Sequence, residues 1–161
     1  MSGAANGVMY KVAYDNVSIT NVVQDLIEIQ AAAGVPVLVH GWKVTFVPTI
    51  TSGVAQDVRA RIQTLVRSTA GSGGVAVTPR ATNQRNTLAA AGTYTRTTIT
   101  TQGTPGNILG SEQPSIIVPY ERVFTAAQRI LIPAGTKWCM FIAAALGAVF
   151  TASFEMDCEE V

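Results

Sequence analysis

The chain has 161 residues and a formal net charge of +1; 48% of its residues are hydrophobic and 13% are charged. This length fits one domain, because a chain near 150 residues buries roughly 68–70% of the surface that unfolding exposes. A net charge this small gives no electrostatic field that would attract nucleic acid or an anionic membrane. Neither is therefore an expected partner. The charged share is well below the usual ~25%, which favours a protein that packs against other proteins.

The N-terminal part of the chain is dominated by strand patterns. Residues 1–8 are expected to form a flexible tail, and the opening MSGAANGVMYK lacks the basic and apolar regions of a signal peptide. The first predicted strand has Tyr10, Val12 and Tyr14 on one face. Residues 18–34 (SITNVVQDLIEIQAAAG) contain the one candidate helix, although DLIEIQ also alternates like a strand.

The middle of the chain alternates between strand patterns and turn residues. VPVLVHGWKVTFV (35–47) predicts a strand buried on both faces, and VRARIQTLV (58–66) alternates between apolar and mostly polar residues. Residues 71–92 (GSGGVAVTPRATNQRNTLAAAG) have no periodicity, and structureless loops beyond roughly 12–15 residues are uncommon in compact domains. The Thr-rich YTRTTITT (94–101) predicts an exposed or interface-facing strand.

The C-terminal segment AVFTASFEMDCE (148–159) is the clearest strand. Its predicted buried face consists of Ala148, Phe150, Ala152, Phe154, Met156 and Cys158. RILI (129–132) and WCMFIAAAL (138–146) predict two more buried strands. The uncharged run 138–154 is shorter than the ~20 apolar residues of a membrane helix and alternates in its second half, so a membrane span is not favoured.

These patterns give about eight strands and at most one short helix. The predicted fold is all-β: one domain over residues 1–161, an antiparallel two-sheet jelly roll or β-sandwich with a long extended loop or arm at 71–92. The connections at 48–57, 68–92 and 102–122 are uneven in length, which favours Greek-key connections over a simple meander.

The residues offer little chemistry. The single histidine, His40, is predicted to be a packing residue, because one histidine cannot build a zinc site. Cys139 and Cys158 lie in consecutive predicted strands and are expected to be buried, reduced thiols. The cluster GSGG is not followed by the residues of a phosphate-binding loop, and the arginines lack interleaved aromatics. We therefore predict no catalytic residue, cofactor or metal, and no enzyme.

One face of the last strand carries a row of acids. Glu155, Asp157 and Glu159 recur at every second position, where like charges repel unless an opposite charge lies beside them. A calcium ion could fill that role, but we expect a basic surface such as Arg59 and Arg61.

Three stretches taken together resemble the small jelly-roll decoration, or cement, proteins on the heads of tailed bacteriophages. They are YKVAYDNVSITNVVQDLIEIQAAAGVPVLVHG, GSGGVAVTPRATNQRNTLAAAG and ASFEMDCEEV. In that group an N-terminal strand leads into the sandwich, a Gly/Ser-rich turn precedes a Thr-Pro pair and an extended arm, and an acidic strand ends the chain. Residues 15–18 and 25–29 match the first element, 71–74 and 78–80 the second, and 159–161 the third.

The resemblance implies a structural role without catalysis. A cement protein lies across the joints between capsomers on the outer surface of the virion and stabilises the shell. Its implied partners are the major capsid protein and copies of itself, as a dimer or trimer, after synthesis in the host cytoplasm. A Thr-faced strand and a weakly charged exterior also favour self-association.

The arm at 71–92 is the expected partner-binding segment. Glycines at 71–74 let the chain leave the domain at any angle, and Thr78-Pro79 biases it towards extended conformations. We expect Thr78, Pro79, Arg80, Arg85 and Asn86 to contact the capsid or a neighbouring subunit, with the arm ordering on binding.

Two other functions fit an all-β domain. A receptor-binding tip or fibre-head domain usually follows a stalk, and no heptad repeat precedes Met9. A cupin needs several histidines, and a lectin usually exposes aromatics. Here aromatics are 7% of the residues, and Trp42 and Trp138 lie in apolar runs typical of a core.

Overall fold

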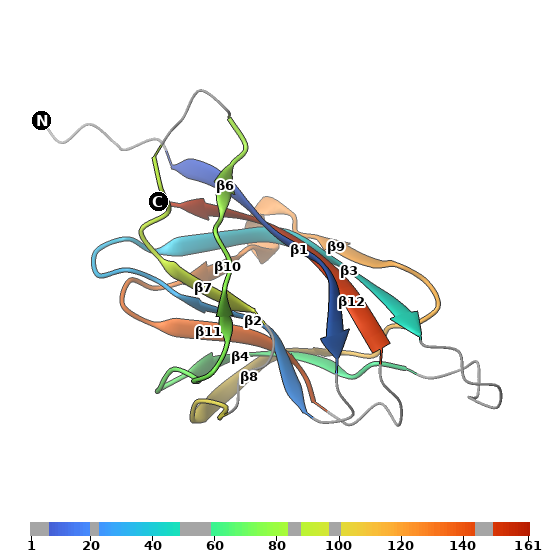
Figure 1. Ribbon diagram of the computed structural model, residues 1–161. Coiled ribbons are helices and arrows are strands. Elements are labelled where there is room, and N and C mark those ends of the chain that lie inside the picture. The colour runs from blue at the N-terminus through green and yellow to red at the C-terminus, as the bar shows by residue number, and fades with distance from the viewer. Residues whose placement is uncertain (1–6, 20–22, 49–58, 84–87, 97–100, 144–149) are drawn as a thin grey trace, which may run out of the picture.

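The computed structural model describes residues 7–19, 23–48, 59–83, 88–96, 101–143 and 150–161 (Figure 1). Within these ranges the chain forms strands, turns and one short 3-10 helix, η1 (Ala126–Gln128), with no α-helix. The strands are β1 (Val8–Ile19), β2 (Gln24–Gln30), β3 (Val37–Pro48), β4 (Ile62–Arg67), β5 (Val75–Ala76), β6 (Arg80–Ala81), β7 (Thr93–Arg96), β8 (Pro105–Glu112), β9 (Tyr120–Val123), β10 (Ile130–Ile132), β11 (Lys137–Ile142) and β12 (Phe150–Glu160).

The strands form two antiparallel sheets. The first sheet has the order β10-β3-β12-β1-β6, with β9 also paired to β3, and the second has the order β5-β7-β2-β11-β4-β8. The first strand therefore pairs with the last, and the last also pairs with the third. The second strand pairs with β11, which also pairs with β4. This nested exchange between two sheets is jelly-roll topology, so the predicted fold class is confirmed.

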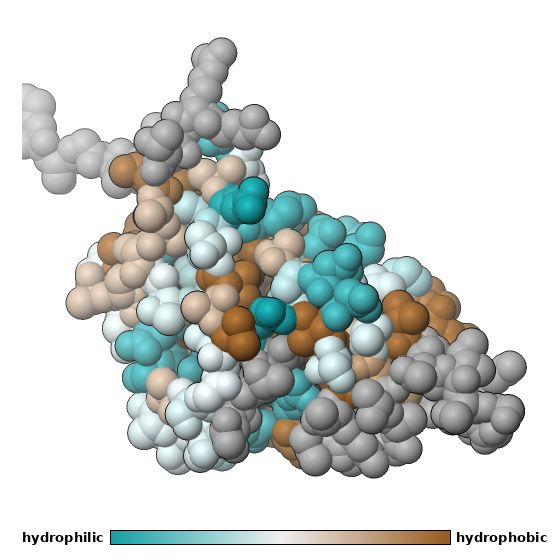
Figure 2. All heavy atoms as spheres, in the orientation of Figure 1, coloured by the Kyte–Doolittle hydropathy of each residue, from teal (hydrophilic) through white to brown (hydrophobic). Residues whose placement is uncertain are grey.

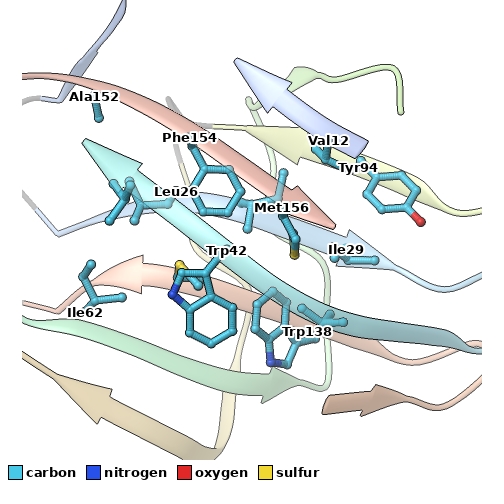
Figure 3. Packing of buried hydrophobic residues seen from close by; sticks show 14 of the residues in the cluster. Val12, Leu26, Ile29, Trp42, Ile62, Tyr94, Trp138, Ala152, Phe154 and Met156 are labelled. Carbon is cyan, nitrogen blue, oxygen red and sulfur yellow. The ribbon is translucent and has the colours of Figure 1, made fainter. Parts of the chain in front are cut away.

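The core lies between the two sheets and follows the predicted alternation. Phe150, Ala152, Phe154, Met156 and Cys158 are all buried on the inner face of β12. Figure 3 shows Phe154 and Met156 in the same cluster as the two tryptophans. Burying one large apolar side chain contributes about 1.5–3 kcal/mol, so this alternation supplies much of the stabilisation.

Both tryptophans belong to that core. Trp42 from β3 and Trp138 from β11 are 5% and 1% exposed, and their ring centroids are 6.3 Å apart across the sheets. Phe124 meets the Trp42 ring edge-on at 4.9 Å. The prediction that neither tryptophan is a surface recognition residue is confirmed.

Several sequence-based boundaries differ from the structure. Val8 pairs with Glu160, so β1 begins inside the expected tail of residues 1–8. The candidate helix at 18–34 is instead the end of β1 followed by β2. Residues 24–29 of β2 are buried on both faces, because Arg67 pairs with Asp25 and Glu28 on the outer side and Gly71 N donates to Glu28 there. Leu65, expected on the exposed face of β4, is likewise buried.

The uncharged run 138–154 does not form one segment. Residues 138–142 belong to β11, residues 150–154 belong to β12, and residues 144–149 lie outside the described ranges. The described residues contain no helix that is long and apolar enough to span a membrane.

Candidate partner-binding surface

Residues 75–82, which we call the strap, cross from the second sheet to the first along one edge of the sandwich (Figure 1). Val75 and Ala76 pair with β7, while Arg80 and Ala81 pair with Lys11 and Tyr10 of β1. Two backbone hydrogen bonds support these pairs: Val77 N donates to Tyr94 O at 2.8 Å, and Thr82 N donates to Met9 O at 2.9 Å. The strap thus covers part of the open edges of β1 and β7, at residues 10–11 and 95–96.

This position corrects the expectation of an arm that leaves the domain. The segment is extended, as predicted, but its strap lies on the domain's own sheets. Thr78 and Arg80 are exposed and Pro79 is half-buried between them. Arg85 and Asn86 lie outside the described residues, so their predicted contacts stay predictions.

Two buried carboxylates hold the ends of the segment that contains the strap. Glu28 accepts a hydrogen bond from Gly71 N at 3.1 Å. Glu160 accepts hydrogen bonds from Ala91 N and Gly92 N, both at 2.9 Å. Both acids are buried among the sheets, at 5% and 9% exposure. Because both ends are fixed, the strap is presented in one place on the domain surface.

Glu28 belongs to a buried ion cluster. Arg67, at the end of β4, donates to Glu28 at 2.6 Å and makes two hydrogen bonds to Asp25, at 2.5 and 2.7 Å. Burial lowers the pKa of Arg67, but hydrogen bonds to Asp25 and Glu28 outweigh this effect and raise it overall. Arg67 therefore stays charged and is the centre of the contacts that fix the start of the segment. Neither composition nor alternation indicated this cluster.

A groove opens beneath the strap. It has a volume of about 510 Å³ and is lined by Ala13, Tyr14, Asp15, Ala76, Val77, Thr78, Arg80 and Arg96. Two of the predicted partner-binding residues, Thr78 and Arg80, thus lie in one groove. The structure adds Arg96 and Tyr14, which the sequence analysis did not single out for binding.

The floor of the groove is rigidly held. Tyr14 donates its hydroxyl proton to Leu26 O at 2.9 Å, and its ring stacks on Phe154 at 5.5 Å. Burial raises the pKa of the Tyr14 hydroxyl, so it stays protonated at neutral pH. The Arg96 guanidinium lies over the Tyr14 ring, 5.7 Å from its centroid. A cation–π contact of this kind orients the guanidinium without neutralising it.

The outer face of the first sheet carries a mosaic of charges. Lys11 lies 3.5 Å from both Glu155 and Asp157, and His40 Nε2 lies 3.0 Å from Glu159. Asp157 is the main cause of the raised pKa of Lys11. A basic partner for the acidic row is thus confirmed, but Lys11 and His40 supply it. The expected Arg59 and Arg61 lie next to β4, in the other sheet.

His40 is largely buried and hydrogen-bonded, as predicted. Its side chain is 17% exposed on the outer face of the first sheet, and its Nε2 lies 3.0 Å from Glu159. The described residues contain no group of three or more His, Cys, Asp or Glu side chains that could hold a metal ion. Cys139 and Cys158 are both buried and free.

The opposite edge of the sandwich is apolar. β8 ends the second sheet and β9 and β10 end the first, and a pocket of about 130 Å³ between them is lined by residues of all three strands. The large exposed apolar residues there are Ile108, Leu109, Ile117, Val118, Val123 and Leu131. Residues 97–120 contain one charged residue, Glu112, which pairs with Arg122 across the pocket.

The fold and these surfaces define a jelly-roll domain with a charged face, an apolar edge and a strap-covered groove. Comparison with known protein families, curated proteins and solved structures finds no match to this chain.

Proposed function

We propose that this chain is a viral structural protein: a decoration or cement protein that binds the outer surface of a tailed-phage head across capsomer joints and stabilises the shell. The motifs quoted from the sequence support this role, and so does the jelly-roll topology, which capsid-associated domains share with several other classes. Its expected partners are the major capsid protein and copies of itself, and no catalytic step belongs to this function.

The uneven distribution of charge is the observation that carries the proposal. The outer face of the first sheet has paired charges, among them Lys11, Glu155 and Asp157. Hydrophilic side chains lie over β1 and β12 in Figure 2. The edge formed by β8, residues 115–118, β9 and β10 exposes large apolar side chains, and two of its three charged residues, Glu112 and Arg122, pair with each other. A monomer rarely leaves such an edge uncovered, so this edge is the side that would face the shell.

The proposed mechanism is additive contact area. One standard interface buries about 1,600 Å² in total, and its free energy resists separation of the two capsomers that it bridges. A dimer or trimer of this chain binds the shell more tightly than a single copy, because once one copy is bound the next copy meets its site at a high effective concentration. Exposed β8 backbone groups could extend a sheet across such a joint.

Sedimentation of the native source lysate on a density gradient, with mass spectrometry of the particle fractions, tests this proposal. We expect the chain to co-migrate with capsids in a fixed, high ratio to the major capsid protein. A few copies per particle would instead indicate a receptor-binding tip or fibre-head domain. Recovery of the chain in the soluble fractions alone would contradict both roles.

A pair of variants tests which side binds. Ile117→Lys places a charge on the apolar edge at a residue that is 61% exposed, so folding should be unaffected. Val47→Lys is the matched control, because Val47 is 55% exposed but lies in β3, whose outer face belongs to the charged side. We expect the first variant to lose occupancy on purified capsids and the second to keep it. Equal occupancy would show that another surface binds.

A further inference from the structure

We propose that the groove beneath the strap binds an extended acidic segment of a partner polypeptide, with Arg80 and Arg96 holding one of its carboxylates. This inference does not rest on the capsid role, because it concerns the chemistry of one groove and can be tested with the purified protein.

Arg80 and Arg96 are the two cations that line this groove, and neither forms an ion pair within the described residues; Lys43, Arg61, Arg129 and Lys137 form none there either, but they lie outside the groove. Elsewhere in the described residues, Arg67 pairs with Asp25, Arg122 with Glu112 and Lys11 with Glu155. No ion pair joins Arg80 or Arg96 to a carboxylate of the described chain, although both line the same groove. Two guanidinium groups that face one space favour a ligand with negative charge.

The one acid that lines the groove, Asp15, forms no ion pair with either arginine. Asp15 accepts a hydrogen bond from the Ser153 hydroxyl, and the neighbouring Asn16 N donates to the same hydroxyl oxygen at 3.2 Å. This contact turns the Asp15 carboxylate towards β12. It follows a local irregularity in the pairing of β1, where Asn16 has a φ of 52°.

The Arg96 side chain is held in advance, whereas Arg80 is held only through its backbone. Tyr14, fixed by Leu26 and Phe154, supports the Arg96 guanidinium from one side. Arg80 lies in β6, which is held by pairing to β1. Because little side-chain freedom remains to be lost at Arg96, a carboxylate that reaches it meets a preorganised donor. The exposed hydroxyl of Thr78 provides one further donor on the same wall.

The strap favours a polypeptide as the ligand. β6 pairs with β1 only at Tyr10 and Lys11, so the edge of β1 that borders the groove at residues 13–15 has no second strand paired to it within the described residues. An extended peptide can add to such an edge through backbone hydrogen bonds while its side chains enter adjacent pockets. The volume of about 510 Å³ lies within the roughly 300–1,000 Å³ of ligand sites and holds a few side chains of a peptide.

The test is fluorescence anisotropy of the purified full chain with a labelled short peptide in which Glu alternates with Val. Its counterpart with Gln in place of Glu, and a backbone N-methylated version, are the comparison probes. We expect the Glu peptide to bind, and its binding to weaken as the salt concentration is raised. The two comparison peptides should bind more weakly, by about tenfold or more.

The variants are Arg80→Gln and Arg96→Gln, with Arg61→Gln and Arg129→Gln as controls. The two controls remove exposed arginines outside the groove. Each groove variant should weaken binding about tenfold or more, and the controls should leave it unchanged. Arg80→Gln keeps the test valid if Arg96→Gln disturbs Tyr14, because Arg80 is exposed.

Four results would overturn the proposal. One is equal binding of the Glu and Gln peptides, and another is unchanged binding in both groove variants. The third is displacement of the peptide by inorganic phosphate far more strongly than by chloride at equal ionic strength. That result would assign the groove to a phosphate group, and unchanged binding of the N-methylated peptide would likewise exclude strand addition.

Discussion

Arg67 holds the carboxylate of Asp25 with two hydrogen bonds, although both side chains are almost completely buried on the outer side of the second sheet. The distances are 2.5 Å from Nη1 to Oδ2 and 2.7 Å from Nη2 to Oδ1, and the side chains are 2% and 0% exposed. Gln102 also donates to Asp25 at 3.3 Å. The cluster thus joins β2, β4 and the chain on both sides of the strap.

Replacing Arg67 should therefore strongly lower the stability of the fold. Arg67→Ala leaves the Asp25 and Glu28 carboxylates buried without their counter-charge, and removing one member of a buried ion pair costs about 3–5 kcal/mol. Urea unfolding measures this loss. Arg61→Ala, an exposed neighbour on the same chain segment, should change stability by less than about 0.5 kcal/mol. A similar small effect for Arg67→Ala would mean that the cluster contributes little.

The cost of Arg67→Ala should also depend on pH. Burial raises the pKa of Asp25, and Arg67 opposes this rise. Without Arg67 the pKa rises further, so a proton neutralises Asp25 in the folded variant as the pH falls. A carboxylate with a raised pKa favours folding at low pH and loses that contribution as the pH rises through the folded pKa. The difference between the urea midpoints of the native chain and the Arg67→Ala variant should therefore be smaller at pH 4 than at pH 7.

The two cysteines should be unreactive in the folded protein. Burial raises the pKa of both Cys139 and Cys158 to about 12. Because the thiolate is the reactive form, a thiol reagent at pH 8 should label neither cysteine until denaturant is added. Rapid labelling of the native chain would show that one of them is accessible.

The same shift makes stability fall in alkali. A thiol has a pKa near 8.5 in an unfolded chain, whereas Cys139 and Cys158 have values of about 12 when folded. Their contribution to stability is therefore complete below about pH 8.5 and is lost as the pH rises towards 12. Urea midpoints should decline between pH 8 and pH 10.5, and more steeply than in the Cys139→Ala/Cys158→Ala double variant. Equal slopes would contradict the burial of the thiols.

Gly41 should not tolerate a side chain. A Cβ at this position would lie 2.6 Å from the backbone oxygen of Arg122, because β9 approaches β3 closely there. Gly41→Ala must move β9 and should cost about 1–3 kcal/mol, measured by thermal or urea unfolding. Thr45→Ala, on the same strand, should cost much less. Comparable losses would show that β9 shifts easily.

Self-association should use β8, the end strand of the apolar edge, and leave residues 115–118, β9 and β10 of that edge to face the shell. β8 is an edge strand whose residues 105–111 carry no charge, so a second copy can pair with it without like-charge repulsion. We expect light scattering at micromolar concentration to give a dimer or trimer. Ile108→Lys, at a residue that is 57% exposed, should shift the mass towards the 16.9 kDa monomer. A monomeric native chain would contradict this prediction.

The sequence by itself determined where most of the strands lie and which side of β1 and β12 is buried. The prediction that β3 and β10 are buried on both faces was wrong, because Val47 and Leu131 are 55% and 57% exposed. Alternation is a local property of an extended chain, so the inner face of β12 and the burial of Trp42 and Trp138 followed from neighbouring residues alone. Turn residues are also a local signal, because they mark where strands end. They showed that the connections differ in length, and this favoured a jelly roll over a simple meander.

Only the tertiary structure decided the rest. β2 is buried on both faces because Arg67 comes from another strand to pair with its acids, and no local pattern indicates a partner 42 residues away. Likewise the strap lies on β1 and β7 instead of leaving the domain, because Glu28 and Glu160 bind its flanking backbone. The groove brings Arg80 and Arg96 to Tyr14 of β1. Such contacts depend on which strands become neighbours, and that is fixed by the packing of the whole sandwich.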